Sequence, residues 1–160
     1  MPTDAACVYW DACVVLSYIN ADSERLPVLE ELLAEARRGE ARIVTSTLSV
    51  VEVAFAAEEQ RQQAPDPATE SQIDALWTPG SVITLAEFHF GIARRARALM
   101  REAMARGWSL KPPDAIHLAT ALQHSADRFH TYDDRLSKYA DISGLIIAEP
   151  QAVQPQLPGS

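Results

Sequence analysis

Three aspartates stand at positions in the sequence where their carboxylates could act together. Asp11 follows the apolar segment CVYW, Asp114 follows Pro112-Pro113, and Asp133 follows the segment FHTY. In open α/β sheets, sites form beyond the carboxyl ends of strands, where helix N-termini also point. The three carboxylates are therefore candidates to converge, although any one of them alone is better explained as a helix cap or a first-turn acid.

Glu52 is the fourth candidate, because it interrupts the apolar run LSVVEVAFAA. A charged residue is rarely buried there without a partner, and a metal ion would be such a partner. The equally weighted alternative is that Glu52 faces solvent on a partly exposed helix.

Carboxylates brought together raise one another's pKa values, and a divalent cation relieves this repulsion. The candidate ligands are all oxygens, and no cluster of His or Cys accompanies them, which favours Mg²⁺, or alternatively Mn²⁺, over zinc. The two cysteines, Cys7 and Cys13, are expected to be reduced core thiols.

The elements that must position these acids follow from the apolar patterning, in which strand-like and helical segments alternate. Strands are predicted at 7–10, 42–45, 81–85, 129–132 and 145–148. Helices are predicted at 14–19, from a Ser23 cap to Gly39, after a Thr47 or Ser49 cap, at 73–77, at 86–106 and at 112–122, with Asp134 capping a last short helix and a loop at 64–68.

This alternation predicts an α/β fold in which helices cover a sheet. One domain is expected over residues 1–149, followed by a flexible Pro- and Gln-rich tail at 150–160. No segment approaches the ~20 apolar residues of a membrane span, so a soluble, cytoplasmic protein without membrane contact is expected.

The formal net charge of −8 argues against nucleic-acid binding through a broad basic surface. It does not exclude a nuclease, because clustered carboxylates can bind cations that contact the phosphate directly. The acidic balance would also attract a basic protein partner.

Four segments in order, YWDACVVLSYI, TSTLSVVEV, ARALMREAMARGWSLKPPDAIHLATAL and FHTYDDRL, resemble the PIN-domain family, and especially its VapC-type toxin ribonucleases. The resemblance implies a three-layer fold with a central, mostly parallel sheet flanked by helices. It carries the family's metal-binding and catalytic acids onto Asp11, Glu52, Asp114 and, in a Thr-x-Asp motif, Asp133.

The chain departs from the family pattern at Asp134, which follows Asp133 at once. Either Asp133 alone or both residues could serve the metal, and Asp133 is preferred.

The resemblance also implies an activity, namely metal-dependent endoribonuclease hydrolysis of RNA phosphodiesters that leaves 5′-phosphate and 3′-hydroxyl ends. It implies the toxin role in a toxin-antitoxin pair, a cognate antitoxin as partner, and a homodimer. The alternatives are an inactive PIN-like interaction module and a metal phosphohydrolase acting on small phosphate esters.

Several neighbouring residues have a structural and a functional interpretation. A packed, hydrogen-bonded residue is the favoured interpretation for His117, a core aromatic for Trp10, and ordinary strand-end hydroxyls for Ser46 and Thr131. Lys111 is the better candidate for substrate binding. A solvated helix face is the favoured interpretation of the arginine stripe, Arg94, Arg97 and Arg101. Four apolar residues either fill the core or line a groove for the antitoxin, namely Val28, Leu29, Leu32 and Leu33.

Overall fold

The computed structural model describes residues 5–61 and 67–153. Their strands form one five-stranded sheet in which every neighbouring pair is parallel. The order is β3 (Ile83–Ala86), β2 (Ala41–Ser46), β1 (Ala6–Trp10), β4 (Arg128–His130) and β5 (Ile147–Ala148). The predicted α/β fold with a mostly parallel central sheet is confirmed.

The chain changes direction across the sheet at its central strand. From β1 it builds β2 and β3 on one side, and it later returns to build β4 and β5 on the other side. The gap between β1 and β4 is therefore a topological switch point, where sites form outside the carboxyl ends of the strands. Asp11 directly follows β1, and Asp133 lies three residues beyond the end of β4.

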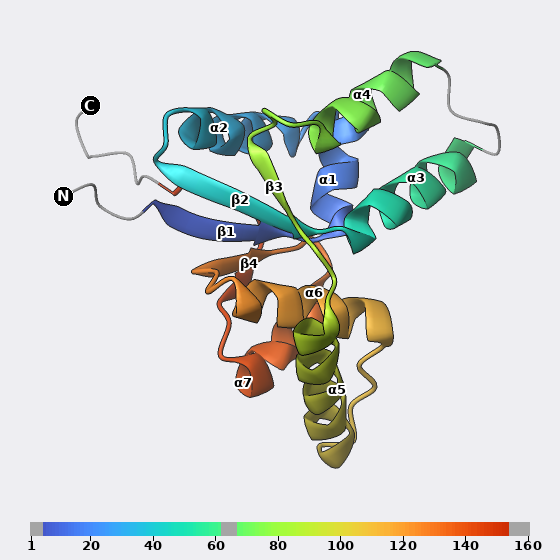
Figure 1. Ribbon diagram of the computed structural model, residues 1–160, viewed down its shortest axis with the longest axis vertical. Helices are drawn as coiled ribbons and strands as arrows, with labels where there is room; N and C mark the ends of the chain where they lie inside the picture. The colour runs from blue at the N-terminus through green and yellow to red at the C-terminus, as the bar shows by residue number, and fades with distance from the viewer. Residues whose placement is uncertain (1–4, 62–66, 154–160) are drawn as a thin grey trace.

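Helices cover both faces of the sheet (Figure 1). One face carries α1 (Ala12–Ile19), α2 (Leu26–Arg37) and α4 (Pro67–Trp77), with α3 (Leu48–Arg61) beside them. The other face carries α5 (Phe90–Ala105), α6 (Pro112–Gln123), the 3₁₀ helix η1 (Asp134–Tyr139) and α7 (Ala140–Ser143). The expected three layers are thus present.

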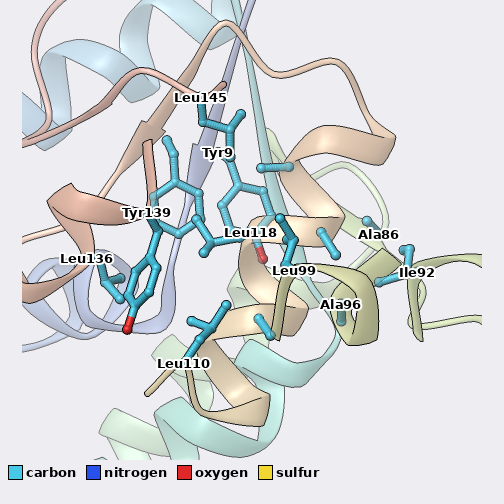
Figure 2. Close-up of a cluster of buried hydrophobic side chains, with 14 of the residues drawn as sticks. Tyr9, Ala86, Ile92, Ala96, Leu99, Leu110, Leu118, Leu136, Tyr139 and Leu145 are labelled. Atoms are coloured by element: carbon cyan, nitrogen blue, oxygen red, sulfur yellow. The ribbon is translucent and has the colours of Figure 1, made fainter. Parts of the chain in front are cut away.

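Alternation along β1 divides the core between these two faces. Val8 and Trp10 point into the cluster beneath α1 and α2, whereas Cys7 and Tyr9 point toward α5 and α6. Figure 2 shows the Tyr9 ring beside Leu118 and Leu99, with its hydroxyl directed away from the strand. Both faces of the strand are buried, as expected for a central parallel strand.

The start of the second predicted helix differs from the sequence prediction. Ser23 does not cap it, because α2 begins at Leu26 and the flanking Arg25 makes no side-chain cap. Instead, the Asp22 carboxylate accepts hydrogen bonds from the amides of Glu24 and Arg25 in the preceding turn, and Pro27 occupies the first helical turn.

The apolar residues of α2 fill the core. Leu29, Leu32 and Leu33 are buried, and only Val28 is partly exposed. The core interpretation therefore holds for the three leucines and not for Val28, which is 37% exposed.

The long helix and its apolar face also differ. The helix α5 starts at Phe90 rather than near residue 86, because His89 is extended and its ring accepts a hydrogen bond from the Gly91 amide. Phe88 therefore precedes the helix and is exposed, and Met104 lies on the outer face. The buried face consists of Ile92, Ala96, Leu99 and Ala103.

Several element boundaries shift. Strand β3 starts two residues later than predicted, β4 ends at His130, and β5 is shortened to two residues. Asp133, not Asp134, caps η1, because its carboxylate accepts the Arg135 amide.

Two further predictions fall partly outside the described residues. Of the predicted loop at 64–68, residues 62–66 are not described, and residues 67 and 68 begin α4. Of the predicted tail at 150–160, residues 154–160 are not described, while the Val153 amide donates to Glu35 Oε2 at 2.9 Å. Among the described residues, no helix is both long and apolar enough to span a bilayer.

Candidate active site

Asp11 joins the end of β1 to the start of α1. It is the N-cap of α1, and its Oδ1 accepts hydrogen bonds from the Val14 amide at 3.3 Å and from the Cys13 thiol at 2.8 Å. The side chain is buried, and this burial raises the pKa of Asp11 above its ordinary value, although the Cys13 hydrogen bond opposes the shift. A buried carboxylate without a cation among the described residues is costly to keep ionised.

Asp114 occupies the first turn of α6, which Pro112 and Pro113 begin. Its pKa is raised, first by desolvation and then by the negative charges of Asp133, Asp11 and Glu52, while His117 acts in the opposite direction. The negative charges of the other three candidate acids therefore reach Asp114.

Glu52 lies in the second turn of α3 and is only partly exposed, with 34% of its side chain accessible. Its Oε1 lies 2.6 Å from Nε2 of His117, which is buried on α6. On its other side, His117 Nδ1 lies 2.6 Å from the hydroxyl of Tyr9. His117 is thus packed and hydrogen-bonded as expected, but one of its partners is a candidate acid.

Tyr9 was missed by sequence reasoning as part of this site. It is fully buried between Phe129, on which it stacks at 5.2 Å, and the imidazole of His117. Burial raises the pKa of its hydroxyl well above the ordinary value, so the hydroxyl stays protonated. The one usable signal is its alternation with Val8 and Trp10, which turns it toward the face covered by α6.

Asp133 differs from the other acids because it has a cationic partner. Arg135 donates to it from Nε, from Nη2 and from the backbone amide, and these contacts lower the pKa of Asp133. Asp134 is exposed and belongs to no such pair in the described part of the chain. Thr131 Oγ1 accepts the Asp133 amide at 3.0 Å, which is a structural role.

The other hydroxyl and aromatic candidates also have structural roles. Ser46 Oγ accepts a hydrogen bond from the Leu48 amide at the start of α3. Ser46 thus makes this capping contact, which the sequence had assigned to Thr47 or Ser49. Trp10 is fully buried and cannot stack on a base. Cys13, expected to be a core thiol, is only partly buried and touches Asp11.

An open cavity of about 230 Å³ lies beside Asp114 and Asp133. Positive charges share its wall with these two acids, so a phosphate entering it would meet cations as well as carboxylates. The lining residues are Ser109, Lys111, Asp114, Asp133, Arg135, Leu136, Lys138 and Tyr139.

The donor chemistry of these acids fits a hard divalent cation, since carboxylate oxygens are the ligands that Mg²⁺ and Mn²⁺ prefer. Within residues 5–61 and 67–153, however, no three His, Cys, Asp or Glu side chains stand close enough to hold one ion together. Mg²⁺ commonly binds through one or two carboxylates and several waters. The residues therefore fit a partly hydrated ion rather than a closed protein cage.

Comparison with solved structures finds this fold in toxin-antitoxin proteins. VapBC2 from Rickettsia felis, bound to a promoter DNA fragment, matches with a TM-score of 0.68 and 15% identity over 89% of this chain and 98% of that chain. A toxin-antitoxin complex from Klebsiella pneumoniae matches with a TM-score of 0.61 and 23% identity over 91% and 99%. VapC20 from Mycobacterium tuberculosis, a sarcin-ricin loop cleaving toxin, matches with a TM-score of 0.62 and 14% identity over 89% and 99%.

No curated protein sequence matches the chain closely enough to count as a relative. The family model for the PIN domain matches residues 8–142, which include all four candidate acids. This match covers most of the chain, and the parallel sheet with its two helical layers agrees with it. The chain therefore belongs to the PIN-domain family, and its fold is that of VapC-type proteins.

Proposed function

We propose that this protein is a metal-dependent endoribonuclease and the toxin of a toxin-antitoxin pair, acting in the cytoplasm. One observation carries the proposal: Asp11 and Asp133 follow the neighbouring strands β1 and β4 at the switch point of a PIN-domain sheet, and Asp133 lines one cavity with Asp114. Membership of the family supports a phosphodiester substrate, and the cations beside Asp114 support binding of a phosphate.

Asp11, Glu52 and Asp114 are the proposed metal ligands, directly or through water, and Asp133 completes the set. When bound, Mg²⁺ or Mn²⁺ activates a water and stabilises charge on the phosphate and the leaving oxygen. The protein's own contribution is to hold the carboxylates at fixed positions. Asp11 is fixed by its capping bonds, and Asp114 by the Pro-started first turn of α6.

The RNA phosphates are proposed to enter beside Lys111 and Lys138, which line the cavity with Asp114. Their ammonium groups neutralise phosphate charge locally, although the chain as a whole carries a net charge of −8. Lys138 also lies near the rings of Trp108 and Tyr139, at 5.7 and 5.4 Å, which restricts its side chain. Several cations on one wall favour a polyanion, which can contact more than one of them, over a small phosphate ester with a single charged group.

An antitoxin is proposed as the protein partner. The solved relatives include toxin-antitoxin complexes, and the acidic charge of this chain suits a basic inhibitory segment. A second cavity, of about 260 Å³, lies among α1, α2, α4 and β3, and Tyr18 and Leu76 contribute apolar surface to it. This cavity is a candidate groove for an apolar part of the antitoxin.

A homodimer is proposed through a second surface. Val51, Phe88 and Phe90 are 66%, 48% and 76% exposed. Their segments meet where the Phe88 amide donates to Thr47 Oγ1, just before α3. Large apolar side chains exposed together mark an interaction surface, and a second copy of the chain offers the same residues.

The nuclease proposal is tested with a fluorogenic single-stranded RNA and a phosphate-ester dye, each with Mg²⁺ or Mn²⁺ and with chelator. RNA cleavage should require metal and fall at least roughly 100-fold in Asp11→Asn and Asp114→Asn. Asp141→Asn is the matched control, because Asp141 pairs with Arg106 and does not line the cavity. Hydrolysis of the dye alone would favour the phosphohydrolase, and inactivity of the metal-loaded protein on both substrates would favour the interaction module.

A further inference from the structure

Three side chains from different elements form one hydrogen-bonded chain that ends at a candidate metal ligand. Tyr9 of β1, His117 of α6 and Glu52 of α3 are joined by two contacts of 2.6 Å each. Both Tyr9 and His117 are buried, and the two rings meet edge to face at 5.8 Å. This series of hydrogen bonds is therefore rigid at Tyr9, in the core, and ends at the partly exposed Glu52, at the site.

A backbone amide decides which groups donate and which accept in this series of hydrogen bonds. The Ser46 amide donates to the Tyr9 hydroxyl oxygen at 3.1 Å, so the hydroxyl's own hydrogen is available for His117 Nδ1. With Nδ1 accepting, the imidazole in its neutral form carries its hydrogen on Nε2, which donates to Glu52 Oε1. The Ser46 amide, the Tyr9 hydroxyl and the His117 imidazole thus each donate one hydrogen bond, and the Glu52 carboxylate accepts the last of them.

This arrangement also excludes two other roles for the imidazole. Both ring nitrogens of His117 are engaged, so neither is available as a metal ligand. Nε2, the nitrogen nearer the acids, carries the hydrogen in this chain and cannot accept a proton from water. The imidazole therefore acts only through Glu52.

We propose that His117, fixed by Tyr9, is the positioning residue for Glu52: it binds Oε1 and leaves Oε2 directed to the cation. This assignment rests on the proposed metal-dependent function. A glutamate that is one-third exposed has several rotamers, and one charge-assisted bond from a buried, rigid donor selects among them. Partners of this kind commonly change metal affinity by about 10- to 100-fold.

The experiment uses the full chain with Mn²⁺ as the probe, and reads affinity by electron paramagnetic resonance as well as RNA cleavage. His117→Leu should weaken Mn²⁺ binding by about 10-fold or more. His117→Gln, whose amide can reach Glu52, should restore part of the loss, and Tyr9→Phe, which keeps the stack on Phe129, should give an intermediate loss. His124→Gln, at the C-cap of the same helix, is the matched control and should change nothing.

A double-mutant cycle separates positioning from general destabilisation. In a Glu52→Gln background, His117→Leu should have little further effect on Mn²⁺ affinity, because the group it positions is already lost. Imidazole ¹⁵N resonances of the metal-free protein should show the Nε2–H tautomer at His117, and should show it less uniquely in Tyr9→Phe. This last measurement needs no activity and no His117 variant that folds.

Two results would overturn the assignment: wild-type Mn²⁺ affinity in a folded His117→Leu protein, or full additivity of the two substitutions. In that case Glu52→Gln alone would still lose Mn²⁺ and cleavage, and the nuclease proposal would stand. A wild-type protein that neither binds Mn²⁺ nor cuts RNA would instead refute the proposed function, and with it the assignment of His117.

Discussion

Arg135 binds both carboxylate oxygens of Asp133, with Nε 2.9 Å from Oδ1 and Nη2 2.8 Å from Oδ2. Asp11 and Asp114 have no such cationic partner among the described residues, and burial raises their pKa values. Of the four candidate acids, Asp133 is therefore paired with an arginine, Glu52 is hydrogen-bonded to His117, and Asp11 and Asp114 are desolvated without such a partner. This division has measurable consequences.

Arg135 competes with a metal ion for Asp133. Arg135→Gln should therefore strengthen Mn²⁺ binding, by no more than about fivefold, because the arginine is 84% exposed and such pairs are weak. Isothermal titration with Mn²⁺ measures the change. Arg106→Gln is the control, since its partner Asp141 lies outside the cavity. Equal affinity in both variants would show that Asp133 takes no part in metal binding.

The buried charge of Asp11 should cost stability when metal is absent. Its pKa is raised in the folded protein, so its favourable contribution exists below the ordinary carboxyl pKa and is lost as pH rises through the folded-state value. Asp11→Asn should therefore be more stable than the wild type at neutral pH. The difference in their free energies of unfolding should disappear in acid. Urea denaturation with chelator at both pH values measures this.

The cap made by the same residue can be separated from its charge. Asparagine caps a helix as well as aspartate does, whereas Asp11→Ala should be about 1 kcal/mol less stable than Asp11→Asn. Adding Mg²⁺ should then stabilise the wild type more than either variant. A wild type that is more stable than Asp11→Asn in metal-free buffer at neutral pH would contradict the desolvation argument.

His130 should make the protein sensitive to mild acid. It is fully buried, neither ring nitrogen has a hydrogen-bond partner within the described residues, and burial lowers its pKa to about 4. The unfolded chain takes up this proton near pH 6.5, so about 3 kcal/mol of stability should be lost as pH falls from 6.5 to 4.

His130→Leu should remove this pH dependence, because it removes the group that titrates. Free energies of unfolding from urea denaturation at pH 7 and pH 4.5 provide the test, with His89→Asn as a control at the exposed start of α5. If His130→Leu loses as much stability between these pH values as the wild type, His130 is not the source of the pH dependence.

The homodimer should depend on the exposed apolar residues between α3 and α5. Phe90→Lys places a charge on a side chain that is 76% exposed, so folding should be unaffected while dimerisation weakens roughly 10-fold or more. Light scattering after size exclusion measures the mass over a concentration series. Met104→Lys, equally exposed on the same helix, is the control, and a monomeric wild type would refute the dimer proposal.

Local sequence patterns determined much of the fold. Strand β1 and helices α1 and α6 agree with the predictions, because apolar periodicity and the Pro112-Pro113 start are local signals. The parallel sheet agrees with what the resemblance to the PIN-domain family implies. The predictions were wrong where a competing contact wins. Ser23 fails as a cap because the Asp22 carboxylate organises the turn before α2, and Met104 lies on the wrong side of a helix whose exact start the pattern could not fix.

The sequence by itself also determined which acids stand at the ends of strands and the starts of helices, because those positions are read from neighbouring residues. Only the tertiary structure decided how each acid is held. Glu52 and His117 are 65 residues apart, and Tyr9 and His117 are 108 apart, so their hydrogen bonds leave no local signature. Burial of Asp11 and pairing of Asp133 with Arg135 likewise depend on which surfaces the packed layers cover, and this sets the opposite pKa shifts of two acids that look alike in the sequence.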